Sequence, residues 1–298
     1  MQALTLSFTI ALSFISLAQG AAINKPVLFT DGLAPHVDAS LLRNLPNTSY
    51  TSDVWEWGWT PQSCMDAANA HNLSPYDFDI WNAHYSDCST PWVFCQHHMA
   101  SLTMEDLFSY FGRLPVHERQ WVRHIIALPG GGSAYMSNAD IVLMGPVKSM
   151  SVFQHEVGHA VDMYKNGKQS SLTSNWTNAI SQDSCVADDY SKTSAVEAYT
   201  QVSILCLYEI VNPGGLDPGI GPQWRCLQNQ KDEVDGFQRD AMWPGGSCDR
   251  RWRDADIVSM GPATGNRKRS RVWPVVDDTL PVPPPGKVEE HDLLHLVF

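Results

Sequence analysis

The segment SVFQHEVGHAVDMY, residues 151–164, places His155 and His159 four positions apart, with Glu156 directly after the first. Helical residues four apart lie nearly above one another, about 6 Å along the axis. Two imidazoles so arranged can bind one zinc ion, while Glu156, about 100° further round the helix, can reach a water on that ion. The segment therefore predicts a helix over 152–165 that carries a metal site.

A chance match is the alternative, because the H-E-x-x-H pattern fixes only three residues. The chain has a near match at His117 and Glu118, where Trp121 stands in place of the second histidine. The helix at 152–165 has more in its favour, because most of its other positions are apolar and predict burial. Buried histidines and glutamates need partners. Ser151, with Gln154 three residues later, is predicted to cap this helix.

A second segment, DDYSKTSAVEAYTQ at residues 188–201, adds to the pattern. Together with HEVGHAVDMY it resembles the zinc metallopeptidases of the lethal-factor type, a branch of the zincins in which glutamate is the third ligand. In that family a tyrosine lies seven residues before the ligand glutamate, as Tyr190 lies before Glu197 here. The resemblance implies the following roles: His155, His159 and Glu197 as zinc ligands, Glu156 as general base, Tyr190 as oxyanion donor, and Asp162 as a residue supporting a ligand.

Two observations leave the third ligand open. The family often has an acidic residue four positions after the ligand glutamate, where this chain has Gln201. Ser194-Ala-Val-Glu197 also fits a capping box, in which the carboxylate turns back to the helix N-terminus. The other acidic candidates for the third ligand are Asp162, Asp188, Asp189 and Glu209.

The resemblance implies a secreted zinc-dependent peptidase that holds one zinc ion per chain. Peptide bonds of a protein or peptide substrate would be hydrolysed by a zinc-bound water that Glu156 activates. An alternative is a zinc-holding, catalytically weak extracellular developmental or binding protein on a zincin fold. A third possibility is a disulfide-stapled domain in which the two histidines are accidental. We expect a monomer.

The predicted fold is α+β and zincin-like. A small sheet with an edge strand would lie over the active-site helix, and a mostly helical second part would follow. The run ADIVLMG at 139–145 predicts a strand suited to that edge. Further helices are predicted at 103–111, 117–128 and about 194–210.

The chain begins with 20 uncharged residues that contain a short apolar run and end in small residues. This pattern predicts a signal peptide over 1–20, because the run is short for a membrane span. The protein is therefore expected outside the cell or in the cell wall, with no membrane attachment after cleavage.

The remaining chain is predicted to form one domain over 21–260. Its parts are a loop-rich part at 21–100, the metal-site part at 101–212 and a disulfide-pinned part at 213–260. A Pro-rich tail at 261–298, with a basic cluster at 267–269, is predicted to be extended or disordered. That cluster is either a processing site or a solvated charge run.

The composition is that of an ordinary globular protein, with 43% hydrophobic and 17% charged residues among 298. The formal net charge of -12 makes nucleic acids and anionic membranes poor partners. Asn47, Asn72 and Asn175 begin glycosylation sequons, which are plausible surface sites in a secreted chain.

Seven cysteines predict disulfides in a secreted chain, with an odd thiol left over. Cys88 and Cys95 could close a small loop. Cys206, inside the apolar run VSILCLY, is the predicted buried free thiol. Cys95 and His98 form a C-x-x-H, but the zinc-finger partner pair does not follow them.

The region from DCSTPWVFCQHH through FGRLPVHERQWVRH also resembles small secreted fungal proteins of the conidiation-specific protein 13 family. This resemblance implies a fungal extracellular protein and supplies no substrate.

Overall fold

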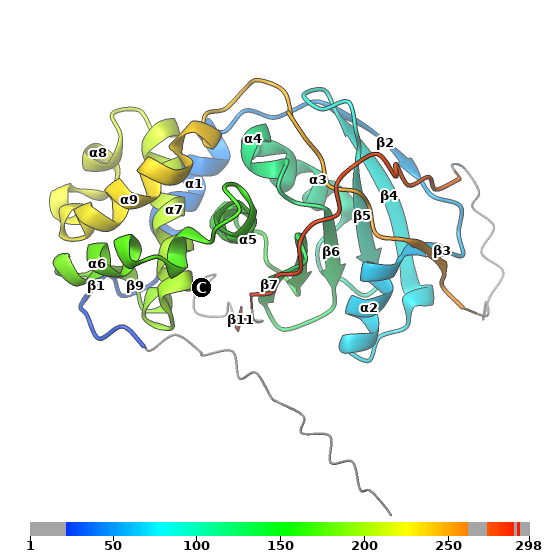
Figure 1. The fold of residues 1–298 in the computed structure, drawn as a ribbon, viewed down its shortest axis with the longest axis horizontal. Helices are drawn as coiled ribbons and strands as arrows, with labels where there is room; N and C mark the ends of the chain where they lie inside the picture. Colours follow the sequence, from blue (N-terminus) through cyan, green and yellow to red (C-terminus); the bar gives the residue numbers. More distant parts are fainter. Residues whose placement is uncertain (1–21, 262–272, 289–290, 293–298) are drawn as a thin grey trace, which may run out of the picture.

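The computed structural model describes residues 22–261, 273–288 and 291–292. These residues form a mixed sheet and a group of helices, so the α+β class is as predicted. Figure 1 shows the sheet in one half of the molecule, helices α6 to α9 in the other, and helix α5 between them. Among the described helices, none is long and apolar enough to span a membrane. The predicted signal peptide lies outside the described residues.

The main sheet has seven strands within the part of the chain that the structure describes. In spatial order they are β11 (His291–Asp292), β7 (Ser133–Ser137), β8 (Asp140–Met144), β6 (His124–Leu128), β5 (Trp92–His97), β4 (Phe78–Tyr85) and β2 (Tyr50–Val54). The pairs β8–β6 and β6–β5 are parallel, and the outer pairs are antiparallel. Two short pairs lie apart from this sheet: β1 (Val27–Phe29) with β9 (Val186–Asp188), and β3 (Trp59–Pro61) with β10 (Ile257–Ser259).

Strand β8 confirms the strand predicted at 139–145, but its predicted place at the edge was wrong. It lies between β7 and β6 and is hydrogen-bonded on both sides. Strand β7 is outside it, and the only strand beyond β7 among the described residues is the two-residue β11. A single strand's sequence does not reveal its neighbours, because burial on both faces looks the same at an edge and in the middle.

The α-helices of the described residues are α1 (Ala34–Asn44), α2 (Gln62–Ala70), α3 (Met104–Arg113), α4 (Val116–Arg119), α5 (Met150–Tyr164), α6 (Ser174–Gln182), α7 (Ala195–Val211), α8 (Leu216–Ile220) and α9 (Gln228–Gln238). Short 3-10 turns are η1 (Pro75–Asp77), η2 (Ser170–Leu172), η3 (Tyr190–Lys192), η4 (Pro222–Leu227) and η5 (Arg239–Ala241). Helices α3, α5 and α7 confirm three predicted helices. The part at 213–260, predicted as loops, contains α8 and α9, and the part at 21–100, predicted as loop-rich, contains α1, α2 and the five strands β1 to β5.

The helix predicted at 117–128 was wrong over most of its length. Helix α4 ends at Arg119, and the chain then enters strand β6. All of β6 is buried, with Ile125 packed in the cluster on one face of the sheet and Ile126 in the cluster on the other. A short strand buried on both faces has no polar alternation, so its apolar run resembles that of a buried helix.

Buried apolar side chains form two clusters, one on each face of the sheet. The larger cluster contains Val157 and Val161 of α5 together with Leu205 of α7. The smaller contains Ala67 and Ala68 of α2. The helix that carries the H-E-x-x-H pattern therefore lies inside the main core.

Three disulfides join distant parts of the chain: Cys64–Cys95, Cys88–Cys248 and Cys185–Cys226. The suggested Cys88–Cys95 loop was wrong, because Cys88 packs in the larger cluster and Cys95 in the smaller, on opposite faces of the sheet. Cys206 is buried and unpaired, as predicted.

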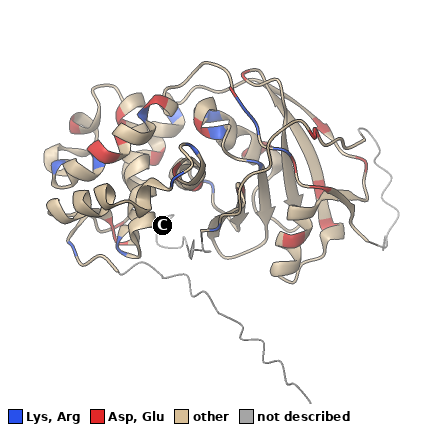
Figure 2. Cartoon of the chain, viewed as in Figure 1, with Lys and Arg blue, Asp and Glu red and all other residues tan. Residues whose placement is uncertain are grey.

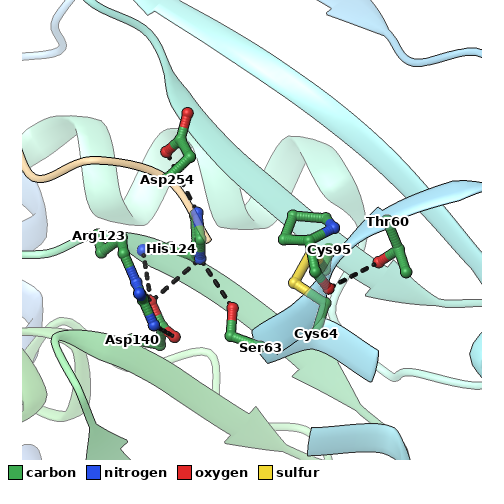
Figure 3. Close-up of a disulfide and its surroundings, with 9 residues drawn as sticks. Thr60, Ser63, Cys64, Cys95, Arg123, His124, Asp140 and Asp254 are labelled. Atoms are coloured by element: carbon green, nitrogen blue, oxygen red, sulfur yellow. Dashed lines mark hydrogen bonds and ion pairs between the residues drawn. A yellow bond between two sulfur atoms is a disulfide. The ribbon is translucent and has the colours of Figure 1, made fainter. Parts of the chain in front are cut away.

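A buried group of ionised side chains lies beside the Cys64–Cys95 disulfide (Figure 3). Arg123 donates two hydrogen bonds to the Asp140 carboxylate, at 2.8 and 2.6 Å. The His124 ring lies 3.0 Å from the Ser63 hydroxyl through Nδ1 and 3.2 Å from Asp254 through Nε2. Burial alone would raise the pKa of Asp140, but the charges of His124 and Arg123 lower it to about 2. Burial alone would lower the pKa of His124, but Asp140 and Asp254 raise it.

These pKa shifts predict the pH range in which the group stabilises the fold. The contribution of Asp140 is present above about pH 4 and is lost as pH falls towards 2. The contribution of His124 is complete below about pH 6 and is lost as pH rises through its raised pKa. We expect the free energy of unfolding of Asp140→Asn to fall by about 3 kcal/mol at pH 5, because a buried charge loses its partner. Thermal melts across pH will measure both effects.

The matched control for this prediction is Asp217→Asn, which breaks the exposed ion pair with Arg225. That pair should contribute about 0–1 kcal/mol. An Asp140→Asn variant as stable as this control at pH 5 would show that the buried group does not stabilise the fold.

Over residues 273–288 the tail is extended, one of the two states predicted for it, and it is hydrogen-bonded to the rest of the fold. The Pro281 carbonyl accepts a hydrogen bond from the Arg253 N–H at 2.9 Å, and the Val288 N–H donates to the Met136 carbonyl at 2.8 Å. Proline-rich chain is already extended, so little conformational entropy is lost when it is held against the fold. The basic cluster at 267–269 lies outside the described residues.

The surface agrees with the acidic composition. Figure 2 shows acidic residues on both the helical and the sheet half of the molecule. The three sequon asparagines, Asn47, Asn72 and Asn175, are all exposed, so each is accessible for the predicted modification.

Candidate metal centre

Helix α5 directs two histidine rings to one point. Its N-cap is Ser149, two residues before the predicted cap Ser151, and the Ser149 hydroxyl accepts from the Val152 N–H at 3.4 Å. The rings of His155 and His159 are nearly perpendicular, with centroids 4.6 Å apart. Their Nε2 atoms lie 3.0 Å apart. Ring nitrogens this close share either a proton or a cation.

Helix α7 brings Glu197 to the same point. The Ser194 hydroxyl caps the helix by accepting from the Glu197 N–H at 3.1 Å. The Glu197 carboxylate turns to the histidines, with Oε2 at 2.9 Å from His155 Nε2 and 3.3 Å from His159 Nε2. The backbone of Glu197 thus takes part in the cap while its side chain joins the histidines.

These three ligand atoms fit a zinc ion. The triangle they form has sides of 2.9, 3.0 and 3.3 Å. Tetrahedral zinc, with bonds of about 2.0–2.1 Å, keeps its ligand atoms about 3.3–3.4 Å apart, so a small outward shift suffices. Two imidazoles and one carboxylate, with a fourth position left over, are a donor set of catalytic zinc sites.

The close approach of α5 and α7 depends on Gly158. A Cβ atom at this position would lie 2.8 Å from the Ser203 hydroxyl and 3.4 Å from Thr200 Cγ2, both on α7. An alanine here would force the Ser203 side chain to turn away, and a bulkier residue would push the two helices apart. The glycine within the H-E-x-x-H pattern is therefore explained by helix packing.

Gln201 orients His155. Its Oε1 lies 3.0 Å from His155 Nδ1, and its Nε2 donates to Asp188 at 2.5 Å. Asp188 is fixed in turn by the Ser191 N–H at 2.9 Å. Because the amide group accepts at Oε1, Nδ1 carries the proton and Nε2 faces the ligand group. The sequence marked Gln201 only as a departure from the family pattern, although its spacing of four from Glu197 places both on one helix face.

Glu156 has an unusual environment. It is fully buried, and among the described residues neither carboxylate oxygen has a hydrogen-bond partner. Burial, together with the charge of Glu197, raises the pKa of Glu156 well above its usual value. This buried carboxylate lacks a hydrogen-bond partner among the described residues and feels the charge of Glu197, so a cation held by Glu197 and the two histidines, with its water, could satisfy it.

Tyr190 lies at the same site, at the start of η3. Its ring centroid is 5.4 Å from that of His155. Burial raises the pKa of its hydroxyl, and the charges of Glu197 and Glu156 raise it further. The hydroxyl therefore stays protonated and is a hydrogen-bond donor at this site.

The remaining acidic candidates are engaged elsewhere. Asp162, predicted to support a ligand histidine, accepts instead from the N–H and hydroxyl of Ser171, and burial raises its pKa to about 6. Gln201 takes the role predicted for Asp162. The other candidates contact the following groups: Asp188 binds Gln201, Asp189 binds Lys192, and Glu209 binds Lys231 and Arg239.

The ligand group is closed to solvent. His155 and His159 are each 1% exposed, and Glu197 is 3% exposed. A metal ion could be held here firmly, but a substrate could reach it only if a covering segment moved.

Comparisons with known proteins give one consistent result. The sequence model of the family described as "Conidiation-specific protein Con-13" matches residues 30–278. A protein of Neurospora crassa described as "Conidiation-specific protein 13" is 32% identical over 268 residues, which cover 85% of this chain and 77% of the relative. No solved structure matches the chain.

Proposed function

This chain belongs to the Con-13 family of conidiation-specific proteins, and we propose that it is a secreted developmental protein that holds one zinc ion on a zincin-like fold. The observation that carries the zinc site is the convergence of His155, His159 and Glu197 on one point, with sides of 2.9–3.3 Å. The closed environment of these residues supports retention of a metal more than rapid turnover.

Peptide hydrolysis is the second candidate function, and the orphaned carboxylate of Glu156 favours it. A site that served only to hold a metal would not need a buried carboxylate without a hydrogen-bond partner, because such a group destabilises the fold. Placed next to the ligands, the same carboxylate is suited to proton transfer.

The residues of the site would divide the chemistry as follows. Zinc, when bound, supplies a Lewis acid that lowers the pKa of water and polarises a carbonyl. Glu156 accepts a proton on its carboxylate and delivers it to the leaving amine. The protonated Tyr190 hydroxyl donates to the developing oxyanion. Gln201 keeps His155 in the tautomer that presents Nε2.

Metal analysis of the purified full chain tests the zinc proposal. We expect about one zinc ion per chain after gentle purification, because three converging ligands suffice for a stable site. A His155→Ala/His159→Ala double variant that keeps its disulfides is the control and should contain none. A wild-type chain that is metal-free and does not take up added zinc would contradict the proposal.

A further inference from the structure

The tail returns to the main sheet as an extended segment over residues 281–288, which we name the strap. Figure 1 shows it running across the sheet towards β7. Gly286 donates to Asn138 Oδ1 at 3.0 Å and accepts from the Asn138 N–H at 2.5 Å. Val288 donates to the Met136 carbonyl at 2.8 Å, and Lys287 pairs with Ser137. Residues 286–288 of the strap thus run antiparallel to the end of β7.

The strap occupies a place that an extended peptide would otherwise take. A strand at a sheet edge presents N–H and C=O groups on which another extended chain can add. Among the described residues, the strap and β11 are what pair with this side of β7. The first part of the strap, PVPPPG at 281–286, contains prolines that have no N–H to donate, so the hydrogen bonds with β7 begin only at Gly286.

The strap also touches the face of α5 that carries the histidines. His155, His159 and Met163 are four residues apart, so their side chains share one face of the helix. Gly286 lies against Met163: a Cβ atom on Gly286 would be 2.0 Å from Met163 Sδ and 2.9 Å from the Tyr164 hydroxyl. Val288 is 6% exposed and packs in the same apolar cluster as α5.

We propose that the strap is a built-in occupant of the peptide-binding edge of β7 and keeps the ligand group of α5 closed. This inference rests on the proposed function for the identity of the metal and of the peptide. The class of molecule that displaces the strap is an extended peptide, because the strap uses its own backbone N–H and C=O groups in these hydrogen bonds, and any extended chain carries such groups. Displacement of the strap would uncover Met163 and, next to it on the same face of α5, His159 and His155.

Two variants release the strap by different means. Gly286→Val places a side chain where Met163 lies and pushes the strap away. Asn138→Gly removes the Oδ1 acceptor, while glycine suits the left-handed backbone there, with φ 51°. Val282→Ala is the matched control on the same segment, because Val282 is 64% exposed.

The readout is carbethoxylation of His155 and His159 in the metal-free full chain, followed by mass spectrometry, with the 43% exposed side chain of His84 as internal reference. Amide hydrogen exchange at Val288 reports whether the strap has been released. We expect the modification rate of the two histidines to rise about tenfold in Gly286→Val, and less in Asn138→Gly, as one or two lost hydrogen bonds shift an opening equilibrium. Val282→Ala should match the wild type.

A released strap with unchanged histidine modification would overturn the proposal. The metal-free measurement decides this even if the chain binds no zinc, so it separates failure of the strap from failure of the proposed function. If Gly286→Val unfolds, Asn138→Gly alone decides, with the modification rates of His155 and His159 taken relative to that of His84. Faster hydrogen exchange at Val288 together with unchanged histidine modification in this variant would contradict the proposal.

Discussion

Glu197→Gln will bind zinc more than about 100-fold more weakly than the wild-type chain, because even changes behind the ligands of a metal site cost about 10–100-fold. The substitution keeps the volume of the side chain but removes the charge that lies 2.9 Å from His155 Nε2 and 3.3 Å from His159 Nε2. Competition with a chromogenic chelator will measure the affinity.

Ser194→Ala is the matched control, because it removes the cap of α7 and leaves the carboxylate in place. The Glu197 N–H would lose its 3.1 Å acceptor, at a cost of about 1 kcal/mol of stability. Zinc affinity should stay close to that of the wild type. If Glu197→Gln were less stable but kept the zinc affinity of the wild type, the role of Glu197 would be limited to stabilising α7. Another residue would then have to be the third ligand.

Glu156→Gln should retain zinc and lose peptide hydrolysis by about 10²–10⁴-fold, the usual contribution of a general base. The comparison is best made in a background with the strap released, such as Asn138→Gly, so that substrate access does not limit the rate. Cleavage of a peptide library followed by mass spectrometry is the measurement. Equal hydrolysis by both chains would remove Glu156 from the mechanism.

The same substitution has a second effect that does not need activity. Since the pKa of Glu156 is raised in the folded chain, its ionisation opposes folding increasingly as pH rises above its unfolded value of 4.5. The metal-free Glu156→Gln variant should therefore be more stable than the metal-free wild type at pH 8, and the difference should shrink towards pH 4. Thermal melts at the two pH values check this; an equal difference at both would contradict the raised pKa.

Some predictions from the sequence failed because local patterns do not specify neighbours. Strand β6 resembles a helix in sequence because both of its faces are buried, one in each cluster. Cys88 and Cys95 are close in sequence, yet the pleat and the turn between β4 and β5 place them in different clusters. The contacts that hold the extended tail could not be predicted, because its partners Met136, Asn138 and Arg253 are far away along the chain.

The sequence alone determined the elements with strong local signals. Apolar spacing located α3, α5 and α7, and the four-residue spacing placed His155 and His159 on one helix face. Spacing also identified Glu197 as a candidate, but it left cap and ligand as competing roles. Only the packing of α7 against Gly158 decided that the carboxylate meets the histidines, because that depends on two helices more than 30 residues apart in sequence. The tertiary structure likewise decided the role of Gln201, the position of β8 inside the sheet and the pairing of the strap with β7. Each of these is a contact between distant segments, and the local sequence of one segment does not predict the other.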